Sequence, residues 1–156
     1  TTFQVLLPAA AGATPTPSPA VTAVAAPWQG AGTVLLVDDE AGVRAVARRV
    51  LRWLGFDVVL AVDGDEAVAA FTADPDRFAV VLLDLTMPGR DGVQTFAALR
   101  ALRPAVRVVL MSGYNEQDAL TRFTGQGLAS FVQKPFTAEA LRAILQQVLD
   151  PDRAPP

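Results

Sequence analysis

The chain has 156 residues, of which 51% are hydrophobic and 19% charged, and its formal net charge is −3. This length supports one hydrophobic core, the mild acidity argues against a nucleic-acid binder held by charge, and no apolar run approaches the roughly 20 residues of a membrane span. The absence of cysteine and histidine excludes disulfides, thiolate metal sites, the usual zinc sites and a phosphohistidine step within these residues.

The first 32 residues differ from the rest, since no charged residue occurs before Asp38. Residues 1–8 read as one short strand closed by a proline. Such a strand is not stable alone, so we interpret it as the remnant of a preceding domain. Residues 9–32, rich in Pro and Ala, predict a stiff linker with polyproline II tendency. A signal peptide is the alternative for the first 13 residues, but they lack a basic start and Pro8 interrupts their apolar part.

From residue 33 onward, short apolar runs alternate with segments of helical periodicity. Runs without internal alternation predict strands buried on both faces, as in a parallel sheet. These strands are expected at residues 33–37, 56–61, 80–84, 107–111 and 130–132. The chain begins with threonine rather than methionine, and we expect a piece of a longer protein or a processed product.

Apolar spacing and capping residues predict five helices between and after these strands. The first carries an apolar stripe of Val43, Val46, Ala47, Val50, Leu51 and Leu54 and stops at Gly55. The others are expected from Asp63 to about Ala73, from about Asp91 to Leu102, around Ala119, Leu120 and Phe123, and from Thr137 over Leu141, Ile144, Leu145 and Val148.

Strict alternation of strands and helices predicts a three-layer α/β domain with a parallel sheet covered on both faces. The expected architecture is a flavodoxin-like (βα)5 doubly wound sheet with strand order 2-1-3-4-5. We place this domain at residues 33–150 and expect residues 151–156 to form a disordered tail.

Acidic residues follow two strands that are neighbours in this order, so Asp38, Asp39 and Asp84 should converge at one edge of the sheet. Two unit charges about 5 Å apart repel by roughly 3 kcal/mol at an effective dielectric near 20, so such a cluster calls for a cation. Oxygen ligands without His or Cys favour a hard ion, Mg²⁺ first, with Mn²⁺ as an alternative. Helix capping would explain one of these acids but not three.

Lys134 is the only lysine among 13 basic residues, and it precedes a proline at the end of the fifth strand. A compact point charge suits a phosphate oxygen. Ser112 ends the fourth strand towards the same edge, although a turn-forming serine explains it nearly as well. With a divalent ion the site sums to zero charge, which would permit in-line phosphoryl transfer to Asp84. Phe131, judged alone, is a core residue.

Four motifs occur together, namely Val37–Glu40, Leu82–Gly92, Met111–Gly113 and Phe131–Phe136. As a set they resemble the receiver domain of two-component response regulators. The resemblance implies that Asp84 is phosphorylated from a phosphohistidine on a histidine-kinase or histidine-phosphotransfer domain. It also implies the following roles: Asp39, Asp84 and the Thr86 carbonyl as direct Mg²⁺ ligands, Asp38 as a ligand through water, Lys134 as phosphate clamp, and Ser112 and Phe131 as switch residues.

The same resemblance implies that phosphorylation remodels the surface of the fourth helix, fifth strand and fifth helix, or that the phosphoryl group is passed on. Family members often carry tyrosine where this chain has Phe131, so an output that needs a tyrosine hydroxyl is in question. Residues 1–8 resemble the closing strand of the ATP-binding domain of sensor histidine kinases, which implies the C-terminal receiver of a hybrid kinase, and we expect this receiver to be cytoplasmic. No nucleic-acid or membrane contact is expected, and weak homodimerisation is left open.

Three other classes compete with this interpretation. A haloacid-dehalogenase-like phosphatase would need a second Asp where this chain has Thr86. A flavodoxin-like cofactor binder would place Asp-Asp-Glu, which repels phosphate, in its phosphate loop. A receiver fold acting without phosphorylation, purely as a protein-binding module, would not need the full acidic and lysine set. Arg44, Arg48 and Arg52 lie at helical spacing beside the site and form either a solvated face or a docking stripe for a helical phosphodonor.

Overall fold

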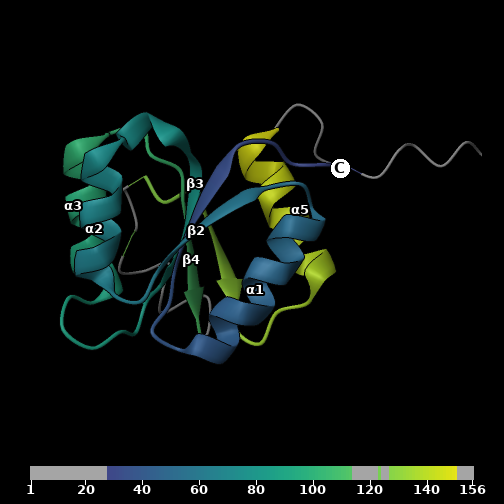
Figure 1. Ribbon diagram of the computed structural model, residues 1–156, viewed down its shortest axis with the longest axis horizontal. Coiled ribbons are helices and arrows are strands. Elements are labelled where there is room, and N and C mark those ends of the chain that lie inside the picture. Colours follow the sequence, from purple (N-terminus) through teal and green to yellow (C-terminus); the bar gives the residue numbers. More distant parts are fainter. Residues whose placement is uncertain (1–27, 114–122, 124–126, 151–156) are drawn as a thin grey trace, which may run out of the picture.

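A computed structural model describes residues 28–113, 123 and 127–150 (Figure 1). The expected remnant strand at residues 1–8, most of the linker and the tail lie outside the described residues. So does the helix expected around Ala119, apart from Phe123. Within the described part of the chain, no helix is long and apolar enough to cross a membrane.

The five expected strands form one parallel sheet with the order β2-β1-β3-β4-β5. This confirms both the doubly wound fold and the predicted order. Runs of Val and Leu without alternation form the three central strands because both of their faces are covered. The strands are β1 (Thr33–Val37), β2 (Asp57–Ala61), β3 (Phe78–Asp84), β4 (Val108–Ser112) and β5 (Ser130–Gln133).

Helices cover both faces of the sheet, with α1 and α5 on one side and α2 and α3 on the other (Figure 1). Their bounds are α1 (Ala41–Trp53), α2 (Gly64–Ala73), α3 (Gly92–Leu102) and α5 (Ala138–Leu149), and a short 3₁₀ helix spans Pro75–Arg77. Side chains cap three of them: Asp63, Asp91 and Thr137 each accept a hydrogen bond from the amide three residues on.

Two apolar clusters fill the space between the sheet and its helices, one on each face. Alternate strand residues contribute to each, so Leu35, Val81 and Leu83 pack with Phe71 and Phe96 under α2 and α3. The other cluster, under α1 and α5, contains Val34, Leu36, Val80, Leu82, Leu51, Leu141 and Leu145. Burying one such side chain stabilises the fold by about 1.5–3 kcal/mol.

One residue of the predicted apolar stripe on the first helix is not buried. Ala47 and Leu51 are fully buried, but Val46 is 62% exposed. Val46 stands at the edge of the helix face that packs on the sheet, so a spacing that fits the stripe still leaves its side chain in solvent. Because α1 begins directly after β1, Val46 instead lies close to the acidic edge of the sheet.

Candidate functional site

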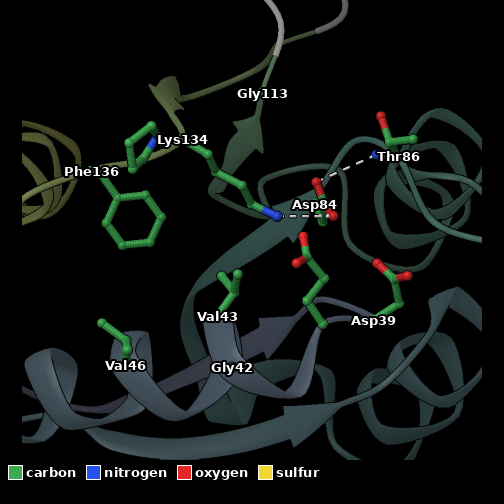
Figure 2. Close-up of a pocket in the computed structure, with 11 residues that line it drawn as sticks. Asp39, Gly42, Val43, Val46, Asp84, Thr86, Gly113, Lys134 and Phe136 are labelled. Atoms are coloured by element: carbon green, nitrogen blue, oxygen red, sulfur yellow. Dashed lines mark hydrogen bonds and ion pairs between the residues drawn. The ribbon is translucent and has the colours of Figure 1, made fainter.

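Three carboxylates meet at the carboxyl edge of the sheet, as the strand order predicts. Val37 of β1 pairs with Leu83 of β3, so the residues that follow these two, Asp38 and Asp84, lie level with each other. Carboxylate oxygens of Asp38, Asp39 and Asp84 all lie within 4.8 Å of one another, so one ion could contact all three. Figure 2 shows Asp39 and Asp84 facing the same space, with Thr86 beside them.

The three aspartates have different surroundings. Asp38 is fully buried, and both of its carboxylate oxygens accept hydrogen bonds, Oδ1 from the Glu40 amide at 2.9 Å and Oδ2 from the Lys134 ammonium at 2.6 Å. Asp84 is 4% exposed. Asp39 is exposed, and within the described residues no hydrogen bond engages its carboxylate. Asp39 is therefore the acid with both oxygens available to an ion.

Lys134 lies across this cluster and bridges two of its members. Its Nζ atom lies 2.6 Å from Asp38 Oδ2 and 3.0 Å from Asp84 Oδ2 (Figure 2 draws the second pair). The end of β5 holds it there, because the Lys134 amide donates to the Ser112 carbonyl at 2.7 Å and Pro135 follows. A single side chain thus neutralises part of a charge that would otherwise sit unpaired in a buried place.

Burial and pairing shift the ionisation of both partners. Desolvation raises the pKa of the Asp84 carboxyl above its ordinary value of 3.8, although the hydrogen bond and charge of Lys134 act in the opposite direction. Burial disfavours the Lys134 ammonium, but its hydrogen bonds to Asp38 and Asp84 outweigh that effect, so the pKa of Lys134 lies above its ordinary 10.5. Lys134 is a permanent cation at neutral pH.

The remaining predicted site residues occupy the same edge at different depths. Thr86 lines the cavity described below, and its amide donates to Asp84 Oδ1 at 3.4 Å. Ser112 ends β4, is fully buried, and is not among the residues that line the cavity. Phe131 belongs to the apolar cluster under α2 and α3, as expected for a core residue.

A cavity of about 690 Å³ opens above the carboxylates and has two unlike halves. The polar half is formed by Asp39, Glu40, Asp84, Thr86 and Lys134. The other half is apolar and includes Val43 and Val46 of α1 together with Pro135 and Phe136, which follow Lys134 (Figure 2). The site therefore has a surface for apolar groups beside its charged groups.

The apolar half of the cavity was not predicted from the sequence. Pro135 and Phe136 belong to a motif of the resemblance, and Val46 fits the apolar spacing of the first helix, but neither pattern predicts that these side chains line a cavity. The signal in the sequence is that Val46 lies at the edge of the apolar stripe on α1, close along the chain to the acidic residues. Among the three arginines at helical spacing, Arg48 and Arg52 are exposed, whereas the guanidinium of Arg44 donates to the Asp38 main-chain carbonyl, a contact that the spacing does not predict.

The fold and the residues at the carboxyl edge of the sheet together define a class of protein. It is a doubly wound α/β domain in which the ends of neighbouring strands carry a carboxylate cluster paired with one lysine. Comparison with known proteins makes this more specific. The chain belongs to the response regulator receiver domain family, whose model matches residues 34–146. It is thus a phosphoacceptor domain of two-component signalling, and an aspartate triad of this kind is typical of the magnesium site in receivers.

Individual relatives differ in length and context. Sporulation initiation phosphotransferase F of Bacillus subtilis strain 168 is 29% identical over 117 residues, which cover 74% of this chain and 92% of that protein. The transcriptional regulatory protein PrrA of Mycobacterium tuberculosis is 38% identical over 117 residues, but the match spans about half (49%) of its length. The receiver domain of the hybrid histidine kinase CckA is 31% identical with a TM-score of 0.65, covering 76% of this chain and all of that one.

Proposed function

We propose that Asp84 is the phosphoacceptor and receives the phosphoryl group from a phosphohistidine on a histidine-kinase or histidine-phosphotransfer domain. A carboxylate oxygen of Asp84 attacks phosphorus, the phosphorus–nitrogen bond breaks, and the imidazole nitrogen leaves with the electron pair and takes up a proton. The position of Asp84 supports this role because its carboxylate reaches the cavity, is nearly buried and lies between Lys134 and two further aspartates.

We assign the metal site to oxygen donors of the same edge. Asp39 and Asp84 would bind Mg²⁺, or Mn²⁺, directly together with the Thr86 carbonyl, while Asp38 would act through water. The hydrogen bonds of Asp38 support that division, since the Glu40 amide and Lys134 already engage its two oxygens. When bound, the ion supplies charge neutralisation for the incoming phosphoryl oxygens.

The neighbouring side chains would then hold the product. On phosphorylation one Asp84 oxygen becomes part of the acyl phosphate, and Lys134, already 3.0 Å from Asp84 Oδ2, is placed to bind a phosphoryl oxygen. Ser112, at the end of the adjacent strand, would turn its hydroxyl to another phosphoryl oxygen. Phe131 would follow inward, which would remodel the surface of β5 and α5. An NMR spectrum of that surface unchanged by beryllofluoride with Mg²⁺ would exclude this switch.

We assign the apolar half of the cavity to the protein that carries the phosphohistidine. A phosphohistidine on the surface of a donor protein can reach Asp84 only if that protein covers the rim of the cavity, and the rim carries an exposed Val46 together with Phe136. Val46→Glu should therefore slow transfer from the donor protein and leave labelling by acetyl phosphate unchanged. Arg48→Glu, also on the exposed face of α1, tests whether a basic stripe adds to this contact. Equal slowing with both donors would place Val46 in the chemistry instead.

For the parent protein we propose a hybrid histidine kinase that contains this receiver. Residues 1–8 would be the last strand of its ATP-binding domain, residues 9–32 the linker, residues 33–150 the receiver, and residues 151–156 a tail. The similarity to the receiver domain of the hybrid histidine kinase CckA supports this proposal. Coding sequence for a kinase domain directly upstream of residue 1 would be the decisive finding.

Phosphoryl transfer to wild type and to Asp84→Asn, each with Mg²⁺ and with EDTA, tests the assignment. Acetyl phosphate serves as donor, so that no protein partner is needed. Label should enter the wild type only with Mg²⁺ and should be absent from Asp84→Asn. Labelling of Asp84→Asn to the wild-type level, or labelling independent of a divalent ion, would refute the proposal.

A further inference from the structure

The corner between β1 and α1 carries Asp38 and Asp39 and is held in an unusual way. In the other three described α-helices, a side chain caps the first turn, namely Asp63 in α2, Asp91 in α3 and Thr137 in α5. The residue in the capping position of α1 is Glu40, and its side chain makes no capping hydrogen bond. The first turn of α1 also contains no acidic residue that would complement the helix dipole.

Two hydrogen bonds made by Asp38 and Arg44 instead hold the residues that lead into this helix. The Asp38 carboxylate accepts from the Glu40 amide at 2.9 Å, and the guanidinium of Arg44 reaches back to the Asp38 main-chain carbonyl. The Asp38 amide donates to the Ala61 carbonyl at 3.3 Å. Thus the amide, the carbonyl and the carboxylate of Asp38 are all engaged, and Arg44 donates the only side-chain hydrogen bond to its carbonyl among the described residues.

Asp39 depends on this arrangement because nothing else in the described part of the chain holds its carboxylate. It lies between Asp38 and Glu40, and its direction towards Asp84 is set by the backbone on either side. Arg44 is half-buried, whereas Arg48 and Arg52, one and two turns further along α1, are exposed. A cation at the start of a helix opposes the dipole, so a half-buried one there requires a compensating partner.

We propose that Arg44 is a positioning residue for the metal site: its hydrogen bond to the Asp38 carbonyl fixes the corner so that Asp39 faces Asp84. This inference rests on the proposed metal site. Arg44 is expected to touch neither the ion nor the phosphoryl group. Its loss would let the corner move and would weaken the ion's hold while leaving Asp84 and Lys134 in place.

A role through charge alone predicts the opposite sign. Arg44 is a cation near a cation-binding site, so removing its charge would strengthen Mg²⁺ binding if electrostatics were its only contribution. Removing a residue that orients a metal ligand costs about tenfold or more in metal affinity. The direction of the change therefore separates the two roles without any knowledge of the partner protein.

The experiment measures Mg²⁺ affinity by calorimetric titration of wild type, Arg44→Met, Arg44→Lys and the control Arg48→Met, with urea unfolding of each. We expect Arg44→Met to bind Mg²⁺ about tenfold more weakly. Arg44→Lys, which keeps a donor and the charge, should recover part of the loss, and Arg48→Met should match wild type. With acetyl phosphate, Arg44→Met should need more Mg²⁺ for half-maximal labelling yet reach the wild-type rate at saturation.

Unchanged or tighter Mg²⁺ binding by Arg44→Met would overturn the inference. A lower labelling rate at saturating Mg²⁺ would also overturn it, because that would place Arg44 in the chemistry. If Arg44→Met does not fold, the Mg²⁺ affinity and the stability of Arg44→Lys decide the question. Wild-type values of both in Arg44→Lys would show that the fork-shaped guanidinium has no positioning role. Failure of the wild type itself to bind Mg²⁺ would instead refute the proposed metal site.

Discussion

Replacing Lys134 by Met should strongly destabilise the domain in the absence of a divalent ion. The substitution keeps an unbranched side chain but leaves Asp38, fully buried, and Asp84, 4% exposed, without their shared cation. The lost ammonium lies 2.6 Å from Asp38 Oδ2 and 3.0 Å from Asp84 Oδ2, where its attraction to each carboxylate amounts to roughly 6 kcal/mol at an effective dielectric near 20. The cost of desolvating the ammonium offsets part of this attraction, so the expected net loss is the about 3–5 kcal/mol typical of removing one partner of a buried ion pair.

Urea unfolding at pH 7 with EDTA measures this loss of stability. A double-mutant cycle shows how much of the loss comes from the interaction of Lys134 with Asp84. Lys134→Met/Asp84→Asn should recover about 2 kcal/mol of the loss, because only one buried carboxylate then remains. Arg48→Met, which removes an exposed charge from α1, should stay within about 0.5 kcal/mol of wild type. The reasoning is refuted if Lys134→Met unfolds at the wild-type urea concentration, or if the second substitution recovers nothing.

Three further predictions concern pH, close packing and the ion. Burial raises the pKa of Asp84 above 3.8, so ionisation of this carboxyl lowers the stability of the fold as the pH rises through the folded-state pKa. At pH 7 with EDTA, Asp84→Asn should therefore have a higher urea midpoint of unfolding than wild type. The difference between the two midpoints should vanish below about pH 3.8. Gly64→Ala should destabilise the fold by about 1–3 kcal/mol, because a Cβ there would lie 2.1 Å from the Thr95 hydroxyl. Gly42→Ala, where a Cβ would have nothing within 4 Å, should instead stabilise the fold by about 0.5–1 kcal/mol. Equal urea midpoints for these two variants would contradict this reasoning. Adding Mg²⁺ at 100 times its Kd should raise the unfolding free energy of wild type by about 2.7 kcal/mol, and an equal gain in Asp84→Asn would place the ion elsewhere.

Strand order and the convergence of the acids were predictable from the sequence because they follow from periodicity and topology alone. Uninterrupted Val and Leu runs indicate a parallel sheet, and once β1 and β3 are neighbours, the residues after Val37 and Leu83 must meet. Lys134 was recognisable as a site residue because it is the only lysine of the chain. Its two ion pairs, however, depend on side-chain reach that no sequence pattern reports.

The sequence-based predictions fail mainly on α1, where residues of one helix both pack on the sheet and border the site. Val46 fits the helical spacing of the core stripe, yet it is exposed and lines the cavity, because the stripe on α1 is wider than the surface that the sheet covers. Arg44 fits the spacing of a basic stripe, yet it bends back to the Asp38 carbonyl. Spacing gives the side of a helix on which a residue lies, but not what the side chain reaches.

Mapping the phosphorylated residue tests the central claim most directly. Wild-type protein is labelled with acetyl phosphate and Mg²⁺ and then reduced with borohydride, which converts an aspartyl phosphate to homoserine, and peptides are sequenced by mass spectrometry. We expect homoserine at residue 84 and unmodified aspartate at residues 38 and 39. Homoserine at either of those two positions, or a phosphate ester on Ser112, would contradict the account of this site.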